Sequence, residues 1–359
     1  MVSIVKKTRR IVPLYLQTAE QLRSRILNGV YPKGSALPSE SELAASFGIN
    51  HITLRKGLRV LADQNLIVQQ HGRGTFVTYA PEENLRIGLV VDAVGGSNSR
   101  YFLWMISELT RQLGELNGNV ILLPTRNVSE KELMDRFHKN RCNGLLISNA
   151  HEKLAAILCN PEFDYIPTCF INNREYWFGG KKRCVIGLKS GAISKAVAYL
   201  KSLGHRRIAY ISADVPDDLV LTERNLDFQH SNIPEPVSRL GVRNVIWYDW
   251  ARQVMHEFAA MAPLQRPTAL ICAGQAFAIG AWVGAAETGL RIPDDISLIG
   301  FDADPGSILW MSSLEQPMEK FIRKAVELFQ TAQISGGILK PDFYEYEAEV
   351  CDRGSCKPI

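Results

Sequence analysis

The sequence is poor in the features that mark secreted, membrane or metal-binding proteins. Its seven cysteines are scattered, odd in number and never fall in the closely spaced pairs of a zinc site. The first ten residues carry four basic side chains and lack the long apolar core of a signal peptide. These absences predict a soluble chain that works in the reducing cytoplasm, away from membranes.

One apolar stretch, residues 268–286, is rich enough in apolar side chains to suggest a membrane helix, and it contains Gly280-x-x-x-Gly284. Gly274 and Gln275 divide it into a short strand pattern followed by a helix pattern. That division is typical of a buried βα unit, so we do not expect it to span a membrane.

Motifs of catalysis are also missing. The chain has no Gly-x-Ser-x-Gly elbow, no phosphate-binding Gly-x-x-x-x-Gly-Lys-Ser/Thr and no metal-type spacing of His, Cys and Asp. Its seven histidines are dispersed along the chain. We therefore expect no enzyme, no catalytic residue, no metal and no cofactor.

Length and charge point to several domains with different partners. A chain of 359 residues predicts two or three domains. Residues 1–80 hold 11 Lys/Arg against 4 Asp/Glu, whereas the rest holds 30 against 33. Positive charge confined to one segment is expected where only that segment faces DNA, although a solvated basic face would give the same balance.

Three helix patterns follow one another in this basic segment. The first covers residues 14–27, and the second begins after Ser39 with the capping box Ser39-Glu40-Ser41-Glu42 and ends at Gly48. The third has Asn50 as its N-cap and continues to about Gln64. A short helix, a glycine turn and a second helix are typical of a helix-turn-helix, whose second helix enters the major groove.

A hairpin pattern follows the three helices. Residues 66–70 and 75–78 are strand-like and are joined by His71-Gly-Arg-Gly. A basic tip of little bulk can reach the minor groove, as the wing of a winged helix does. The Gly72-x-Gly74 pair could also belong to a nucleotide-binding fingerprint, but no third glycine opens a helix after it.

Residues 11–78 resemble the GntR (gluconate-repressor) winged-helix family throughout. The resemblance is carried by Pro13-Leu-Tyr-Leu-Gln, Gly29-Val-Tyr-Pro-Lys-Gly, Leu37-Pro-Ser-Glu-Ser-Glu-Leu-Ala, Phe47-Gly-Ile-Asn-His-Ile-Thr-Leu-Arg and Gly72-Arg-Gly-Thr-Phe-Val. It implies that Thr53 and Arg55 hold phosphates and that Asn50, His51 and Ile52 lie at the groove-facing end of the recognition helix. It further implies wing contacts from His71 to Thr75, that is from His71, Gly72, Arg73 and Thr75.

Two departures from this family pattern concern base recognition. The family often has arginine where this chain has Ser41 and His51. Because arginine makes the usual bidentate contact with guanine, we expect an operator different from the family's usual one. His51 could also be a solvated surface histidine, while DNA binding itself rests mainly on phosphate contacts.

After a short linker with Pro81, short apolar strands alternate with helices from Leu85 onward. This alternation predicts parallel sheets covered on both faces, and about 270 residues suffice for two doubly wound lobes with a ligand crevice between them. The fold class is therefore α/β, with an N-terminal winged helix-turn-helix and two Rossmann-like lobes. We expect the winged domain at 1–79, the linker at 80–85 and the two-lobed domain at 86–359, with one lobe at 86–186 and 317–345 and the other at 187–316 and 346–359.

The second segment resembles the sensor domain of lactose- and galactose-repressor proteins, of periplasmic-binding-protein type. The strongest matches are Leu203-Gly-His-Arg-Arg-Ile-Ala-Tyr-Ile and Gly289-Leu-Arg-Ile-Pro-Asp-Asp-Ile-Ser-Leu-Ile-Gly-Phe-Asp. A GntR head on such a body is the architecture of the arabinose-repressor group. The resemblance implies that the effector contacts come from Tyr101, Phe102, Arg224, Trp250, Gln275, Asp302 and Gln316.

An aromatic plane with Arg, Asp and amide groups suits a sugar, which has an apolar ring face and a rim of hydroxyls. Trp250 could instead belong to the core, and Asp302 could cap a loop. The chain also departs from the pattern at Gln275, where an acidic residue is usual, and at Gly187-Leu188, where Asp-Asn is usual. The effector could therefore be an unusual carbohydrate or no sugar at all.

Together these patterns predict a sequence-specific transcription regulator, a ligand-responsive repressor of carbohydrate-use genes. It would act as a homodimer on an inverted-repeat operator in double-stranded DNA. The alternative is a sugar-binding protein of a transport or sensing system that binds no specific operator.

Overall fold

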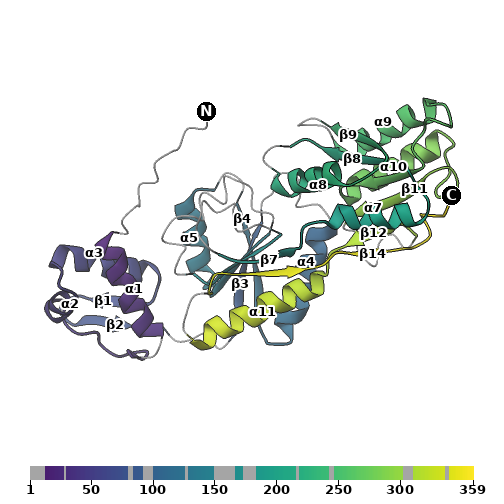
Figure 1. Ribbon diagram of the computed structural model, residues 1–359. Helices are drawn as coiled ribbons and strands as arrows, with labels where there is room; N and C mark the ends of the chain where they lie inside the picture. The colour runs from purple at the N-terminus through teal and green to yellow at the C-terminus, as the bar shows by residue number, and fades with distance from the viewer. Residues whose placement is uncertain are drawn as a thin grey trace, which may run out of the picture.

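The computed structural model describes residues 13–27, 30–79, 84–91, 100–125, 128–148, 166–172, 183–215, 218–241, 246–301, 310–335 and 339–359. Three bodies are distinguishable in Figure 1: a small N-terminal head, and two α/β lobes that we call the N-lobe and the C-lobe. The predicted α/β class with an N-terminal helix-turn-helix is confirmed.

The head consists of three helices and a hairpin. Its elements are α1 (Leu14–Leu27), α2 (Glu40–Phe47), α3 (His51–Asp63), β1 (Ile67–Gln70) and β2 (Gly74–Val77). The strands pair antiparallel, with Ile67 opposite Val77. Buried leucines and isoleucines from all three helices and β1 form one apolar core, and burial of such side chains is the main stabilising contribution in so small a domain.

The N-lobe is built on a six-stranded sheet in the order β13-β7-β6-β5-β3-β4, in which all pairs are parallel. Helices α4 and α11 pack with one set of buried strand residues in an apolar cluster. Helix α5 packs with the alternate strand residues in a separate cluster. The elements are β3 (Arg86–Val91), α4 (Arg100–Gly114), β4 (Asn119–Pro124), α5 (Glu130–Lys139), β5 (Gly144–Ser148), β6 (Thr168–Ile171), β7 (Cys184–Leu188), α11 (Met318–Ser335) and β13 (Asp342–Tyr346).

The C-lobe has a second six-stranded sheet in the order β14-β12-β11-β10-β8-β9, parallel except for the pair β12–β14. One large apolar cluster joins its strands to its helices. The elements are α7 (Ala192–Ser202), β8 (Arg207–Ala213), α8 (Leu219–His230), β9 (Glu235–Gly241), α9 (Trp247–Ala260), β10 (Ala269–Cys272), α10 (Gln275–Glu287), β11 (Ser297–Phe301), β12 (Ser312–Glu315) and β14 (Glu349–Cys351).

Helices α9 and α10 lie unusually close because of two glycines on α10. A Cβ atom at Gly284 would lie 2.6 Å from the carbonyl oxygen of Arg252, and one at Gly280 would collide with the backbone of Tyr248. The Gly280-x-x-x-Gly284 spacing therefore serves helix packing within the C-lobe. In the described part of the chain, no helix is both long and apolar enough to cross a membrane.

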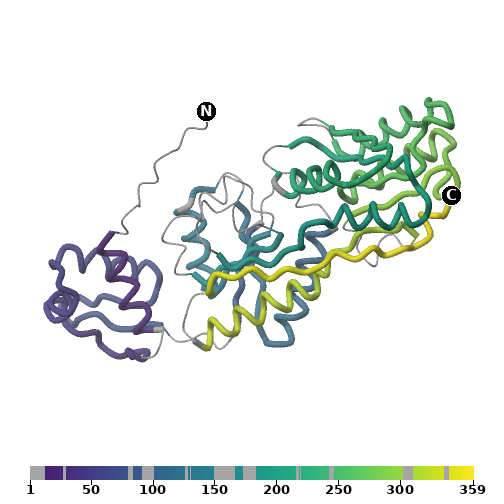
Figure 2. The backbone as a smooth tube through the Cα atoms, viewed as in Figure 1, coloured from purple at the N-terminus to yellow at the C-terminus, as the bar shows by residue number. Residues whose placement is uncertain are grey.

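The chain passes between the lobes at three described places. It leaves the N-lobe after β7, returns after β12, and leaves again after β13, as the tube in Figure 2 shows. Two of these passages are tied together: the Lys189 amide donates to the Tyr346 carbonyl at 2.8 Å, and Lys195 forms an ion pair with Glu347. These two passages therefore lie side by side, an arrangement about which two lobes can hinge.

Candidate DNA interface and effector pocket

Helix α3 has one buried face, which fixes the direction of the other. Leu54, Leu58 and Leu61 are fully buried against the head core. A Cβ atom at Gly57 would lie 2.9 Å from the Tyr15 carbonyl oxygen of α1, so the two helices touch there without a side chain between them. The opposite face of α3 therefore points to solvent.

That outer face is strongly basic. Its exposed residues are His51, Ile52, Arg55, Lys56 and Arg59, followed by Asp63 at the end of the helix. The side chain of Arg55 is 70% exposed, and its Nε donates to a carboxylate oxygen of Glu40 on α2 at 2.8 Å. Such a face can bind phosphates on the two strands that border a DNA groove.

The helix ends next to this face are held by the predicted caps. The Ser39 side chain accepts from the Glu42 amide. The Glu42 carboxylate accepts from the Ser39 hydroxyl and from the Ser39 amide, each at 2.8 Å, and these two bonds lower the pKa of Glu42. The Asn50 side chain accepts from the Thr53 amide at 2.8 Å. Asn50 and the Thr53 amide thus have a structural role at the start of α3, while Ser41 is exposed on α2.

The wing presents a small, exposed tip. His71, Gly72 and Arg73 are exposed, and Gly72 has φ 72°, a left-handed backbone that glycine adopts without strain. Thr75 differs from the other predicted wing contacts because only 9% of it is exposed and its carbonyl accepts from the Leu37 amide. The structure therefore ties Thr75 into the head and leaves His71, Gly72 and Arg73 accessible.

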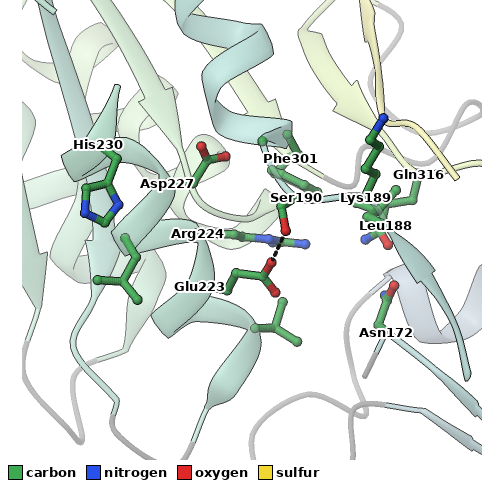
Figure 3. Close-up of a pocket in the computed structure, with 14 residues that line it drawn as sticks. Asn172, Leu188, Lys189, Ser190, Glu223, Arg224, Asp227, His230, Phe301 and Gln316 are labelled. Carbon is green, nitrogen blue, oxygen red and sulfur yellow. Dashed lines mark hydrogen bonds between the residues drawn. The ribbon is translucent and has the colours of Figure 1, made fainter. Parts of the chain in front are cut away.

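A cavity of about 350 Å³ lies where the two lobes meet. Its size is that of a site for a small molecule. Asn172 follows β6 of the N-lobe, Leu188 ends β7, and Gln316 follows β12. Figure 3 shows these three side chains on the same side of the pocket. The described residues that line it are Asn172, Leu188, Lys189, Ser190, Gly191, Ala192, Val220, Glu223, Arg224, Leu226, Asp227, His230, Phe301 and Gln316.

Arg224 is held in position by ring stacking and by a hydrogen bond to the backbone. Its guanidinium carbon lies 3.4 Å from the centre of the Phe301 ring, and one of its terminal nitrogens donates to the Ala273 carbonyl at 2.5 Å. In Figure 3 the side chain extends from α8 across the pocket toward Leu188 and Gln316. A guanidinium stacked on an aromatic ring gives the pocket a flat, oriented group of hydrogen-bond donors.

The acidic residues of the pocket have partners in the protein. The Asp227 carboxylate accepts from the Ile193 amide at 2.7 Å and from the Ser194 hydroxyl at 2.5 Å, so it caps the start of α7. A carboxylate oxygen of Glu223 accepts from the Ser190 hydroxyl at 3.3 Å, the bond drawn in Figure 3. These two contacts join α8 to the first passage between the lobes.

Of the seven predicted effector residues, the structure brings Arg224 and Gln316 into the pocket. Tyr101 is near its edge, because its buried hydroxyl accepts from the Asn172 side chain at 2.5 Å. Phe102 packs against the N-lobe core, and Gln275 starts α10; neither is among the described lining residues. Asp302 lies outside the described residues.

Trp250 has the core position that the sequence left open as its alternative role. Its indole N–H donates to the Ser212 carbonyl at 3.2 Å, and its ring packs against the C-lobe cluster. It is not among the described residues that line the pocket. Among the described lining residues, the phenyl ring is that of Phe301 at the end of β11.

Several lining residues were missed by the sequence analysis. Asn172 is visible in the sequence as the polar residue that ends the apolar strand 168–171, the position where parallel sheets carry ligand contacts. Glu223, Asp227 and His230 lie on successive turns of α8. This helix belongs to a region in which the resemblance to the lactose- and galactose-repressor sensors is weak. Their spacing alone gave no signal for a pocket.

Metal sites and reactive thiols would be other sources of chemistry in the described residues. They contain no group of three or more His, Cys, Asp or Glu side chains able to hold a metal ion. The described cysteines are free, and all but Cys351 are buried. Burial raises the pKa of Cys169, which lies beside Cys184 on the next strand, so these thiols have the character of core residues.

Comparison with known proteins agrees with both parts of the chain. The family model described as "Bacterial regulatory proteins, gntR family" matches residues 14–77, and the model "Periplasmic binding protein-like domain" matches residues 197–356. The arabinose metabolism transcriptional repressor of Geobacillus stearothermophilus is 28% identical over 312 residues, which are 82% of this chain and 83% of that protein. The protein of the same name from Halalkalibacterium halodurans is 23% identical over 79% of this chain and 78% of that protein.

A solved structure supports the fold of the two lobes. The crystal structure of a LacI-family regulatory protein from Chloroflexus aggregans superposes with a TM-score of 0.60 over 76% of this chain and 98% of that chain, at 23% identity. Residues 14–77 thus form a DNA-binding domain of the gntR family, and the chain is a transcription regulator whose larger part has the periplasmic binding protein-like fold.

Proposed function

We propose that this regulator is a ligand-responsive repressor of carbohydrate-use genes. The observation that carries the proposal is the pairing of a basic, solvent-facing recognition helix with a separate pocket at the junction of two lobes. The relatives named as arabinose metabolism repressors, which span four-fifths of the chain, point to sugar metabolism as the regulated process.

In this proposal the head binds DNA through a small set of side chains. Arg55 and the hydroxyl of Thr53 hold phosphates, and the N-terminal end of α3 with Asn50, His51 and Ile52 faces the base edges of the major groove. The exposed Ser41 of α2 contributes a further contact, and His71, Gly72 and Arg73 of the wing reach the minor groove.

The effector is a small molecule with hydrogen-bonding groups and one apolar face, for which a sugar or sugar derivative is the first candidate. Arg224, Asn172 and Gln316 offer hydrogen bonds from both sides of the pocket, while Leu188 and Phe301 offer apolar contact. Leu188 stands where related sensors have a polar residue, so we propose an effector with fewer hydroxyls at this side than a simple hexose.

Effector binding is coupled to the DNA through the lobes. A ligand that contacts Asn172 on one side and Arg224 on the other favours a closed arrangement of the lobes about the three passages. In a homodimer formed through the sensor lobes, that closure changes the separation of the two heads on an inverted repeat. The affinity for the operator changes only as far as the effector binds the two arrangements with different free energies.

The regulator acts in the cytoplasm, without enzymatic activity, on double-stranded DNA. The winged domain covers residues 1–79, the linker 80–85 and the two-lobed effector domain 86–359.

Selection of genomic DNA fragments by the purified full-length protein at physiological salt tests this proposal. We expect recovery of a shared inverted repeat beside carbohydrate-use genes, and release of that DNA by one member of a panel of mono- and disaccharides. Binding without any common sequence, lost as salt rises, would show phosphate attraction alone and favour the alternative of a sugar-binding protein without an operator.

A matched pair of variants makes the test specific. Lys56→Ala removes one charge from the outer face of α3, and Lys340→Ala removes one charge far along the chain, beyond α11. We expect weaker DNA binding and a salt dependence reduced by about one counterion per half-site for the first variant, and no change for the second.

A further inference from the structure

Helix α3 carries one apolar side chain among its exposed residues. Ile52 is 71% exposed, whereas the other exposed positions of this fully described helix are histidine, arginine, lysine and aspartate. The buried face is complete without it, because Leu54, Leu58 and Leu61 already fill the contact with the head core. Ile52 therefore contributes little to the fold of the head.

The position of Ile52 relative to the basic residues fixes what it would meet. It lies three and four residues before Arg55 and Lys56, so all three side chains point to the same side of the helix. When Arg55 and Lys56 contact phosphates at the border of the major groove, Ile52 at the N-terminal end of α3 faces the base edges. An aliphatic side chain has no hydrogen bond to offer there.

In the major groove, the four standard bases expose one apolar group, the C5-methyl group of thymine. Isoleucine is well suited to this group because its branched Cβ leaves one strongly preferred rotamer in a helix, so that little side-chain freedom is lost on contact. We propose that Ile52 reads the methyl group of one thymine in each operator half-site, which makes it a specificity-determining residue. This inference rests on the proposed function of the head as a sequence-specific reader.

The test uses the full-length protein and the operator recovered by selection, with each thymine replaced in turn by deoxyuridine. This replacement removes the methyl group and keeps every hydrogen-bonding group of the base pair. We expect one thymine in each half-site at which the replacement weakens binding about fourfold, and about 15-fold when both half-sites are changed, as for burial of one methyl group each.

The same DNA series with Ile52→Ala separates direct contact from DNA shape. We expect this variant to bind the thymine operator more weakly than the wild type and to bind the thymine and deoxyuridine operators equally well. Lys56→Ala serves as the matched control on the same face, since it should weaken binding to both operators while keeping the difference between them. The unfolding midpoint of Ile52→Ala should equal that of the wild type, because the side chain is exposed.

Failure of the proposed role of Ile52 can be distinguished from failure of the proposed function of the head. A shared operator without any methyl-sensitive thymine would overturn this inference and leave the proposed function intact. A deoxyuridine effect that persists in Ile52→Ala would do the same, because the methyl group would then act through DNA shape. Recovery of no shared sequence would overturn the proposed function and, with it, the reading of thymine.

Discussion

The head and the effector pocket place their binding side chains in opposite ways. On the head these side chains lie along one exposed helix, and the local sequence around Asn50 and Leu54 determines which of them face outward. In the pocket they come from segments as far apart as Asn172 and Gln316, and only the folded sensor brings them together. The first surface is present as soon as a helix forms, whereas the second depends on two lobes and their connections.

The two regions also differ in how their charged groups are occupied. On α3, the side chain of Arg55 is mostly exposed, so solvent screens its ion pair with the half-buried Glu40 and phosphates can replace the carboxylate at small cost. In the pocket, Arg224 is stacked on Phe301 and bonded to a backbone carbonyl, and Asp227 caps α7. The side chains of such a pocket are already oriented before the ligand binds, so little conformational freedom is lost on binding.

The largest expected effect is the unfolding of the head while the two lobes stay folded. Leu58→Ala empties a fully buried position in the head core, and such a change costs about 2–5 kcal/mol. In a domain of this size that loss removes most of the stability, so we expect loss of DNA binding. All six tryptophans lie in the larger segment, at positions 104, 177, 247, 250, 282 and 310, so their fluorescence reports only on the lobes.

The denaturant midpoint of that fluorescence should stay at the wild-type value in Leu58→Ala. Leu264→Ala, at an exposed C-lobe position, should leave both DNA binding and fluorescence unchanged. A fall of the tryptophan midpoint in Leu58→Ala would mean that the head and the lobes unfold as one unit.

The next effect concerns the pocket alone. Arg224→Met keeps the length of the side chain and its contact with Phe301 but removes every hydrogen-bond donor. Because hydrogen bonds to a charged group contribute about 1.5–3 kcal/mol, we expect a 10- to 150-fold higher concentration of the releasing sugar. The measurement is operator release over a sugar titration.

Operator affinity without sugar should be unchanged in Arg224→Met. Arg252→Met is the matched control, since Arg252 of α9 pairs with Glu287 at the end of α10 and is not among the described residues of this pocket. Equal sugar responses of the two variants would show that Arg224 does not contact the effector.

A smaller effect tests the local order of the head. Ser39→Ala removes the capping side chain of α2, which costs about 0.5–2 kcal/mol. We expect a lower stability of the head, seen as faster hydrogen exchange of the α2 amides, and unchanged tryptophan fluorescence. Ser46→Ala is the control on the same helix, because its hydroxyl donates back to the Leu43 carbonyl and caps no free amide. Equal exchange in the two variants would contradict a capping role.

The local signals explain how much the sequence could predict. The caps at Ser39 and Asn50 and the turn at Gly48 were predicted and are confirmed, because each depends on residues three or four positions apart. The alternation of strands and helices was also predicted correctly, since short apolar runs between helical patterns persist in the buried strands. Thr75 shows the limit within the head, because its backbone is bonded to Leu37, far away in the sequence.

The pocket could be predicted only in part because its composition is a tertiary property. Arg224 was found through a family resemblance, while Phe301, the last residue of a buried strand pattern, gave no sign of facing a ligand. Trp250 was expected to stack on the ligand, yet the turn of α9 directs its N–H to the Ser212 carbonyl. Which face of a helix meets a cavity depends on how the helix packs, and spacing along the chain does not contain that information.

The smallest expected effect is a difference in the response of the two regions to pH. In the head, burial raises the pKa of Glu20 to about 7 against the opposing charge of Arg23. In the N-lobe, burial and secondarily the charge of Arg23 lower the pKa of His138 to about 4. Burial also lowers the pKa of His205, whose ring bonds to Thr268 and to the Lys357 carbonyl.

These shifts have opposite signs in the pH dependence of stability. Between pH 7 and 4.5 the folded head binds the Glu20 proton more tightly than the unfolded chain does, so acidification stabilises the head. Below pH 6.5 the unfolded chain binds protons at His138 and His205 more tightly than the folded lobes do, because the folded pKa of both is lowered, so acidification destabilises the lobes. Lowering the pH from 7 to 5 should therefore slow hydrogen exchange in α1, after correction for the intrinsic rate, and lower the tryptophan denaturation midpoint. Glu20→Gln should abolish only the slower exchange in α1, and His205→Gln should reduce only the fall of the tryptophan midpoint. If acidification shifted the stability of both regions in the same direction, the charges of the head and the lobes would respond to pH as one system.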